Sequence, residues 1–470
     1  MDKRGRTALL VAAGTALLLG IAYLLAPKMG TDLSAQVARA NFFRAHGFRP
    51  IDFRWYGGVN QLGYSLTTPA LMSVIGSRVL GVVASVIFAP AATYVLLRTN
   101  APRPVLGGAL FGIMAVGNIA SGRITFAAGL AFATLAVAVV LSPAARVPRL
   151  IAVGALAVLT TVTSPIAGLF LGLAAAAWLL ADAVWADRRF RRGPEFSTTL
   201  VMGGCAAVGL IPMQIFSDGG TEPFSAAQMR YNVAITLAVI LIVPAYRVIR
   251  IAAVLTLALL FFALYVPTAI GSNSIRLPML FAFPIIVAYS QWRNWAIVLA
   301  LMGIWWWQAP IVVGDITQAG SPETKAAFYQ PLLGELSTLG TLGRIEVVPL
   351  RDHWESSYVA DEVPLARGWL RQVDTDRNPL FYTSKPVTAA QYGDWLRANA
   401  VQYVAYAPDQ PLDVYARTEA AVVSAHPSYL REVWHSAQWQ LFQVTDPEPF
   451  VTGGTLVSVG ATAVTFDTAA

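Results

Sequence analysis

Long apolar segments follow one another through the first two thirds of the chain, with very few acidic residues between them. Residues 1–314 contain eight carboxylates, which are Asp2, Asp32, Asp52, Asp182, Asp187, Glu195, Asp218 and Glu222. Of all 470 residues, 56% are hydrophobic and 13% are charged, about half the charged fraction of an average soluble domain. Because a bilayer leaves backbone groups to be satisfied within helices, the sequence predicts an α-helical polytopic membrane protein.

The apolar segments give the predicted spans. A helix needs about 20 apolar residues to cross a bilayer, and about eleven segments approach this length. They cover residues 7–27, 77–97, 104–121, 124–142, 148–163, 165–185, 198–216, 232–248, 249–271, 277–291 and 295–313. We therefore expect a multi-span transmembrane domain over residues 1–313, with an outer loop at 28–76. The first segment follows basic residues as a signal peptide does, but its length and the poor cleavage sequence at 26–28 favour a retained span.

Basic residues predict the orientation of these spans. Residues 1–314 hold 23 Lys and Arg against 8 acidic residues, a net charge of +15, whereas residues 315–470 hold 10 against 18, a net charge of −8. The strongest basic cluster, at 188–192, falls in a predicted cytoplasmic loop, as the positive-inside rule requires. We expect a multi-pass protein of the inner (plasma) membrane with its N-terminus in the cytoplasm. The basic excess thus reflects topology and not binding to nucleic acid.

The C-terminal region, residues 314–470, has the composition of a globular domain. An odd number of spans places it outside the cytoplasm. Strands are predicted at 341–350 and 401–406, and helices at 366–373, 389–398 and 412–424, so we expect a small extracytoplasmic α/β domain. A β-rich tail follows, with a hairpin at 452–465. The single cysteine, Cys205, excludes an intrachain disulfide, and the four scattered histidines form no zinc motif.

The first outer loop carries the acidic candidates. A helix is predicted from Asp32 to about residue 45, with Thr31 as its cap and Gly47 at its end. Asp32 either favours the helix dipole or acts as a functional carboxylate beside the first span. Asp52 and Arg54 follow, next to Trp55 and Tyr56 and a Gly-Gly pair. Aromatic rings at this depth are often interfacial anchors, but rings combined with carboxylates also suit the recognition of sugars.

Arginines on the predicted outer side are the basic candidates. Arg276, Arg123 and Arg54 lie where topology does not require positive charge, so they are candidates for binding a lipid phosphate or diphosphate. The alternative is that each pairs with headgroups or extends along the lipid interface.

Two further candidate sites lie elsewhere. Glu222 belongs to a Gly-rich outer loop whose ordinary role would be a turn. His353, in the sequence Asp-His-Trp-Glu, could contact an acceptor, although such residues usually belong to an ordinary surface or core.

Several short motifs lie at the predicted outer ends of the spans. The loop after the first span opens with Asp32 and continues through Trp55-Tyr56-Gly57-Gly58 into Thr68-Pro69. Gly122-Arg123 comes later, and Gly271, Asn273, Arg276 and Leu277 form another motif. Together with the charged N-terminus and the outer C-terminal domain, this pattern resembles the bacterial GT-C-type membrane glycosyltransferases, especially the actinobacterial arabinosyl- or mannosyltransferase-like proteins. A high Ala and Arg content also suits a GC-rich bacterium.

The resemblance implies an activity and residue roles. Enzymes of this type move a sugar from a polyprenyl-phosphate donor to a glycan or glycolipid acceptor outside the cytoplasm. Asp32 would then be the general base, Arg276 and Arg123 would hold the donor phosphate, and Asn273 would belong to the substrate site. The chain departs from the pattern in one respect. Many relatives carry two adjacent acidic residues in this loop, whereas Asp52 lies some twenty residues after Asp32, so Asp52 is the alternative base.

Two functions of other classes remain as alternatives. A transporter or flippase for a lipid-linked precursor would place ionisable groups at the midplane, and the predicted spans contain almost none. A non-catalytic scaffold of the cell envelope would use the acidic outer domain to bind partners. The expected partners are the bilayer, the lipid-linked donor and the acceptor, with no nucleic acid. No cofactor is predicted, with a divalent metal kept as an alternative.

Overall fold

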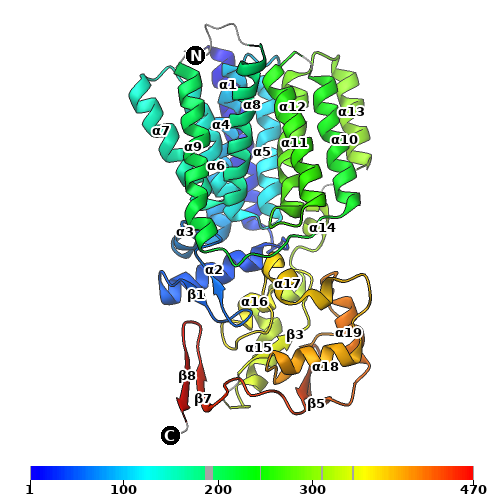
Figure 1. Cartoon of the computed structure of the whole chain (residues 1–470). Coiled ribbons are helices and arrows are strands. Elements are labelled where there is room, and N and C mark those ends of the chain that lie inside the picture. The colour runs from blue at the N-terminus through cyan, green and yellow to red at the C-terminus, as the bar shows by residue number, and fades with distance from the viewer. Residues whose placement is uncertain (1, 186–193, 244, 308–310, 341–342, 469–470) are drawn as a thin grey trace. The chain divides into compact units, whose positions relative to one another are not determined.

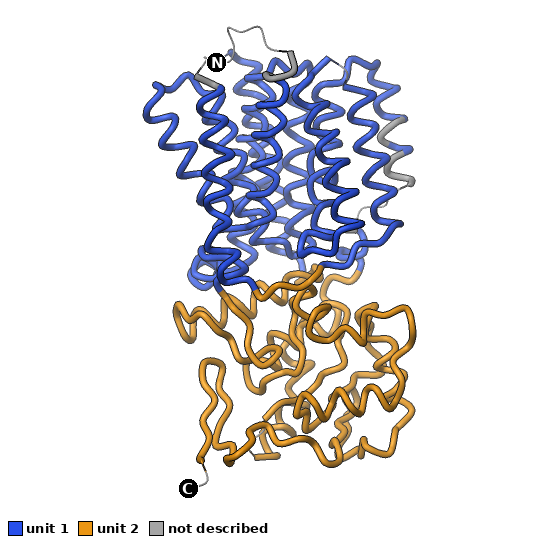
Figure 2. The backbone as a smooth tube through the Cα atoms, viewed as in Figure 1, with its two compact units in different colours: residues 1–27, 62–217, 222–317 blue, residues 28–61, 218–221, 318–470 orange. Residues whose placement is uncertain are grey.

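A computed structural model describes residues 2–185, 194–243, 245–307, 311–340 and 343–468. The chain divides into two compact units (Figure 2). The first unit contains residues 1–27, 62–217 and 222–317, and the second contains residues 28–61, 218–221 and 318–470. The predicted domain boundary at residue 313 places the first outer loop, residues 28–76, in the membrane domain. Its residues 28–61 instead cluster with the C-terminal residues, because they supply strands, side chains and an ion pair to that unit.

The first unit is a bundle of helices whose long members run side by side (Figure 1). Each predicted span overlaps mainly with one helix, and these helices are α1 (Lys3–Leu25), α4 (Ser77–Arg98), α5 (Pro104–Ala120), α6 (Ile124–Val140), α7 (Arg146–Thr163), α8 (Pro165–Trp185), α9 (Pro194–Ile215), α10 (Ala226–Ile242), α11 (Arg247–Tyr265), α12 (Arg276–Tyr289) and α13 (Asn294–Trp307). The predicted span 295–313 extends past α13, and its residues 308–310 lie outside the described residues. The shorter α3 (Thr68–Ile75) and α14 (Ile311–Thr317) complete the unit. Among the described residues, six helices are long and apolar enough to span a membrane. The expected helical membrane architecture is confirmed.

Local sequence explains where these helices begin. Asp2 caps α1 by accepting a hydrogen bond from the Gly5 amide at 2.8 Å. Helix α10 begins at Ala226, six residues before the predicted span, because Ser225 and Gln228 form a capping box at its start. The apolar pattern used for the prediction does not register such a polar first turn.

Small residues allow the first unit to pack closely. Ala8, Ala12 and Ala16 of α1 are fully buried. A side chain at Gly112 of α5 would begin 3.0 Å from the backbone nitrogen of Ala16. Small residues such as glycine and alanine let membrane helices approach closely. The contact between α1 and α5 therefore depends on the small side chains at these positions.

The second unit is an α/β domain with a four-stranded sheet in the order β3-β4-β6-β5. Its strands are β3 (Ile345–Val347), β4 (Tyr403–Tyr406), β5 (Leu430–His435) and β6 (Gln440–Val444). Strands β3 and β4 are parallel, and the other pairs are antiparallel. The helices are α2 (Leu33–His46), α15 (Ala326–Leu336), α16 (Glu355–Tyr358), α17 (Arg371–Arg377), α18 (Ala389–Ala398) and α19 (Arg417–Ser424). Short pairs β1 (Ile51–Asp52) with β2 (Val59–Asn60) and β7 (Gly454–Val459) with β8 (Val464–Thr468) add two small antiparallel sheets.

The core of this unit confirms several expected elements. Helix α18 coincides with the predicted helix 389–398, because Thr388 and Gln391 form a capping box at its start. It buries Tyr392 and Leu396 against Val404 of β4 and Phe442 of β6. The predicted strands 341–350 and 401–406 contain β3 and β4, and the predicted hairpin is β7–β8, shifted toward the C-terminus.

Two predicted helices in this unit are partly wrong. Where the segment 366–373 begins, the backbone amide of Leu365 donates to the Arg54 carbonyl and that of Ala366 to the Ile345 carbonyl. The chain is therefore extended at these residues, and α17 begins only at Arg371. In the segment 412–424, Asp413 accepts the Tyr415 amide in a turn, which delays α19 until Arg417.

Strands β5 and β6 were not predicted. In β5 only Leu430 is buried, and exposed residues such as Arg431 and Glu432 follow it. The alternation of apolar and polar residues that marks a half-buried strand is therefore absent from β5.

Candidate functional site

The segment that carries Asp32 is fixed in the second unit by residues distant in sequence. The Lys28 carbonyl accepts the Gly320 amide at 2.9 Å, and the Lys28 ammonium donates to the Tyr358 hydroxyl at 2.7 Å. Gly30 has φ +97°, a left-handed value that favours glycine, and its carbonyl accepts the Leu33 amide. The chain thus makes a tight turn immediately before α2.

Asp32 itself stands at the N-cap of α2. It is half-buried, its φ and ψ are −87° and −7°, and its side chain makes no capping hydrogen bond. The prediction of Thr31 as the cap is wrong, because Thr31 is used through its backbone instead. The Thr31 carbonyl accepts a hydrogen bond from Trp369 Nε1 at 2.8 Å. The predicted end of the helix is confirmed, since Gly47 has φ +69° and its amide donates to Phe43.

Asp52 and Arg54 form a buried ion pair. Asp52 is 0% exposed, and its two oxygens accept Arg54 Nε at 3.0 and 3.2 Å and Arg54 Nη2 at 2.8 Å. The Arg54 amide and Gln61 Nε2 also donate to this carboxylate. Arg54 pairs in addition with Asp361 and donates to the Ala38 carbonyl. Although burial lowers the pKa of Arg54, the two carboxylates outweigh it and raise that pKa above its usual value.

Trp55 and Tyr56 lie in the interior of the same unit. Trp55 is 0% exposed and donates from Nε1 to the Ser356 carbonyl at 2.9 Å. The indole leaves no room for a side chain at Gly368, where a Cβ would stand 2.3 Å from it. Tyr56 has φ +56° and donates from its hydroxyl to the Gly368 carbonyl at 2.8 Å. The two rings therefore hold the first loop to the segment around residue 368.

His353 is buried between two carboxylates. It is 3% exposed, Nδ1 lies 3.2 Å from Glu355 Oε1, and Nε2 lies 3.2 Å from Asp413 Oδ2. Its ring stacks on Trp369 with centroids 3.6 Å apart and an interplanar angle of 11°. Burial lowers the pKa of His353, but the two carboxylates overcome it and raise that pKa. The pKa of Asp413, despite burial, is lowered by His353 and by Arg371.

In the first unit, Glu222 meets the motif that contains Arg276. The Ser272 hydroxyl donates to Glu222 Oε1 at 2.7 Å, and the Glu222 amide donates to the Thr268 carbonyl at 3.0 Å. Gly271 has φ +37°, and a Cβ there would stand 1.9 Å from the Glu222 carbonyl oxygen. This contact between residues fifty positions apart was not apparent from the sequence. It fixes the short 3₁₀ helix Gly271–Ile275 that leads into α12.

Arg276 is the first residue of α12 and is half-buried. Its guanidinium carbon lies 5.4 Å from the centroid of the Phe126 ring. Phe126 is three residues after Arg123, the N-cap of α6, and residues three apart share a helix face. The structure therefore brings the two predicted arginines to the same end of α6. Asn273 is 7% exposed and donates to the Ala269 carbonyl at 3.3 Å.

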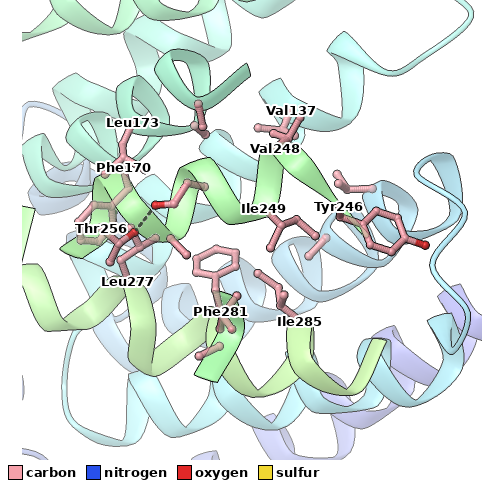
Figure 3. A pocket seen from close by; sticks show the side chains of 18 of the residues that line it. Val137, Phe170, Leu173, Tyr246, Val248, Ile249, Thr256, Leu277, Phe281 and Ile285 are labelled. Atoms are coloured by element: carbon pink, nitrogen blue, oxygen red, sulfur yellow. Dashed lines mark hydrogen bonds between the residues drawn. The ribbon is translucent and has the colours of Figure 1, made fainter. Parts of the chain in front are cut away.

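An apolar cavity of about 760 Å³ runs between helices of the first unit. Leu277 and Pro278, which directly follow Arg276, line one part of it, and Tyr246 and Tyr289 line another. In Figure 3, Leu277 lies beside Thr256 and Phe170, whereas Tyr246 lies at the opposite end. Its lining residues on α12 run from Leu277 to Tyr289, so the cavity follows this helix for about 18 Å. Its length and apolar walls suit a hydrocarbon chain.

Comparison with known proteins identifies the fold. No family model and no curated protein matches the sequence. Among solved structures, the arabinofuranosyltransferase AftD from mycobacteria matches 97% of this chain with a TM-score of 0.52 and 14% identity. The match covers 42% of AftD, so the chain spans less than half the length of that protein.

Two other solved structures are similar at lower scores. The oligosaccharyltransferase of Archaeoglobus fulgidus has a TM-score of 0.48 and 11% identity, with 100% of this chain and 74% of that chain covered. ArnT from Cupriavidus metallidurans, bound to undecaprenyl phosphate, has a TM-score of 0.49 and 13% identity, with 93% and 97% covered.

The chain has the fold of a GT-C-type membrane glycosyltransferase. AftD, which shares this fold, is an arabinofuranosyltransferase. The long apolar helices of this chain are those of an integral membrane protein. The predicted resemblance and fold class are thereby confirmed.

Proposed function

We propose that this protein is a membrane glycosyltransferase that moves a sugar from a polyprenyl-phosphate donor to an extracytoplasmic glycan or glycolipid acceptor. The observation that carries this proposal is the fold shared with AftD over 97% of the chain. Two features of the chain's own structure support it, namely a half-buried carboxylate at the N-cap of α2 and an apolar cavity lined by Leu277, the residue after Arg276.

Asp32 is the general base in this proposal. A base must reach the acceptor hydroxyl, and Asp32 is half-buried at the end of a helix. Asp52 is fully buried, and both of its oxygens accept hydrogen bonds within the protein. We therefore assign Asp52, with Arg54, to holding the loop in shape. Arg54 is committed to two carboxylates, so it is not assigned to the donor phosphate.

Arg276, with Arg123 as a second contact, binds the donor phosphate, and the polyprenyl chain occupies the cavity beside α12. Asp32 takes the proton of the acceptor hydroxyl, whose oxygen forms a bond to the anomeric carbon. The bond from that carbon to the phosphate oxygen breaks, and the electron pair leaves with polyprenyl phosphate. A guanidinium stabilises the charge that develops on the leaving phosphate.

A transfer assay with purified protein tests the proposal. Radiolabelled polyprenyl-phosphate sugars would be offered with membrane glycolipid acceptors to the wild type, Asp32→Asn, Asp52→Asn and Asp409→Asn. Asp409 is an exposed carboxylate of the same unit and serves as the matched control. We expect Asp32→Asn to lower the rate at least 100-fold, in the range lost with a general base, and Asp409→Asn to leave it unchanged. Asp52→Asn should lower the folded fraction while each folded molecule keeps its rate.

The same assay separates the alternatives. Full activity of Asp32→Asn would remove Asp32 as the base. Binding of donor lipid without transfer from any donor would favour a carrier or a scaffold. We propose no resident cofactor, so treatment with EDTA should leave the rate unchanged. A loss that Mg²⁺ or Mn²⁺ restores would establish a metal requirement.

A further inference from the structure

The segment around Asp32 is attached to the C-terminal part of the second unit on both sides of the carboxylate. On one side, Trp369 Nε1 donates to the Thr31 carbonyl at 2.8 Å. On the other, the Ser34 hydroxyl donates to the Asp352 carbonyl at 2.8 Å. Asp352 immediately precedes His353 in the chain. The position of Asp32 is thus set by residues more than 300 positions away.

Trp369 is itself held by charged neighbours. Its ring stacks on His353 at 3.6 Å, and the Arg371 guanidinium carbon lies 4.6 Å from the ring centroid. Arg371 donates to both oxygens of Asp413, at 3.1 and 2.6 Å, and Asp413 also contacts His353. The indole of Trp369 therefore contacts both His353 and Arg371, and these two side chains share the Asp413 carboxylate.

His353 is the centre of this set. Each ring nitrogen faces a carboxylate oxygen at 3.2 Å, Glu355 at Nδ1 and Asp413 at Nε2. Burial raises the pKa of Glu355, although His353 opposes this shift. When both carboxylates are ionised they only accept hydrogen bonds, and only the imidazolium can donate to them from both nitrogens. His353 also has φ +52°, an uncommon conformation for a residue with a side chain. The surrounding contacts must maintain this backbone.

We propose that Trp369 and His353 are positioning residues that hold Asp32 through the Thr31 carbonyl, with His353 acting as the imidazolium. This inference rests on the proposed role of Asp32 as the base. Its chain of contacts runs from the two carboxylates to the imidazolium, from there by stacking to the indole, and from the indole to the backbone beside Asp32.

Loss of the His353 proton should loosen the arrangement. A neutral imidazole donates from one nitrogen and presents a lone pair at the other, so one of the two hydrogen bonds between the ring and its carboxylates would be lost. The charged groups around the ring are Glu355 of α16, Asp413 before α19, and Arg371 of α17 through Asp413. The two carboxylates raise the pKa of His353 above 6.5, so the arrangement is complete below about pH 6.5 and fails as the pH rises through the higher folded value.

Trp369→Phe tests the hydrogen bond. The substitution removes Nε1 but keeps a ring for stacking. Trp439→Phe is the matched control, because Trp439 Nε1 also donates to a backbone carbonyl, that of Phe328 at 2.9 Å. We expect amides of residues 28–34 to exchange hydrogen about tenfold faster in Trp369→Phe, and at the wild-type rate in Trp439→Phe. A tenfold change corresponds to about 1.4 kcal/mol, near the upper end for one hydrogen bond. Unchanged exchange in Trp369→Phe would overturn the proposal.

His353→Gln tests the charge. We expect the wild-type turnover number to fall at alkaline pH, and this alkaline fall to be absent from His353→Gln, which has no titrating group there. His435→Gln is the control, since His435 is 74% exposed beside Glu432 and should keep the alkaline fall. The KM for the acceptor should stay unchanged in His353→Gln. Persistence of the alkaline fall in that variant, or an equal loss at every pH, would overturn the role of the proton.

The two measurements separate this inference from the proposed function. Hydrogen exchange measures how well the amides of residues 28–34 are protected, whether or not the protein transfers sugar. Faster exchange in Trp369→Phe together with an active Asp32→Asn would support the attachment and reject Asp32 as the base. Unchanged exchange with an inactive Asp32→Asn would support the base and reject the attachment.

Discussion

At the scale of single residues, the buried charges of the second unit are the main constraint on substitution. Arg54 lies between Asp52, which is 0% exposed, and Asp361, whose side chain is 34% exposed. Two carboxylates in one ion-paired cluster thus differ in their access to water. Since solvent screens an exposed pair and not a buried one, they should differ strongly in their contribution to stability.

Asp52→Asn should lower the free energy of unfolding by about 3–5 kcal/mol, the range for breaking a buried pair, because the buried Arg54 would keep only the partly exposed Asp361 as its counter-charge. Asp361→Asn should change it by about 0–1 kcal/mol, because water screens the partly exposed Asp361 and Asp52 still pairs with Arg54. Unfolding in detergent, followed by the tryptophan fluorescence of the protein, measures both. Equal losses of unfolding free energy would show that Asp361 stabilises Arg54 as much as Asp52 does.

A second prediction at this scale concerns pH. The pKa of His353 is raised from 6.5, so its contribution to the free energy of unfolding is complete below about pH 6.5 and is lost as the pH rises through the higher folded value. The pKa of Asp413 is lowered from 3.8, so its contribution is complete above about pH 3.8 and is lost on acidification.

Unfolding of the wild type and His353→Gln across the pH range checks this expectation. The stability difference between the two proteins should be largest between about pH 3.8 and 6.5. It should shrink as the pH becomes alkaline. A difference that stays constant from acid to alkaline pH would contradict the assignment of His353 as a cation.

At the scale of elements, the start of α12 depends on one glycine. Gly271 has φ +37°, and a Cβ there would overlap the Glu222 carbonyl oxygen at 1.9 Å. Gly219, with φ +73°, has nothing within 4 Å of the same point. The two positions share the left-handed backbone but differ in space, so Gly219→Ala is a matched control for Gly271→Ala.

Gly271→Ala should displace the turn that precedes Arg276 and lower donor affinity at least tenfold, whereas Gly219→Ala should carry only the cost of its backbone, about 1 kcal/mol. Binding of labelled polyprenyl phosphate measures the difference. Equal affinities in the two variants would show that Arg276 tolerates movement of the turn or does not hold the phosphate.

The cavity beside α12 supports another prediction at this scale. Ala282 is 3% exposed and lines the cavity, so Ala282→Leu should fill part of it. Transfer from donors with long polyprenyl chains should fall more than transfer from short-chain donors, because only long chains occupy the filled part. An equal loss for both would indicate that the substitution disturbs packing and not chain binding.

At the scale of the whole molecule, the sequence predicts the membrane helices but not the long-range contacts of the candidate site. Apolar length alone locates α1 and α4–α13, because each membrane helix carries its signal within its own residues. The partners of the candidate site carry no such signal. Asp52 and Arg54 are two residues apart, but Asp361 joins them from 307 positions away. Trp369 is 338 positions from Thr31. These contacts depend on the tertiary fold, and spacing in the sequence does not encode them.

Because the second unit is built from separate segments of the chain, removal of its first segment should destabilise it. Residues 318–470 alone lack Trp55, which pairs with Leu365 and fills the space beside Gly368. A protein of only these residues should aggregate or unfold at lower temperature than one in which residues 28–61 are joined to it. Circular dichroism melting of both proteins checks this. Equal melting temperatures would show that the first loop is dispensable.

The divided second unit also has a consequence for synthesis in the cell. Residues 28–61 leave the ribosome some 257 residues before residue 318, an interval of roughly 13–51 s at about 5–20 residues per second. During that time Trp55 and the Asp52–Arg54 pair have no partner to cover them. A nascent chain in this state is a substrate for proteases and chaperones. Its survival therefore depends on how fast residues 62–317 are translated.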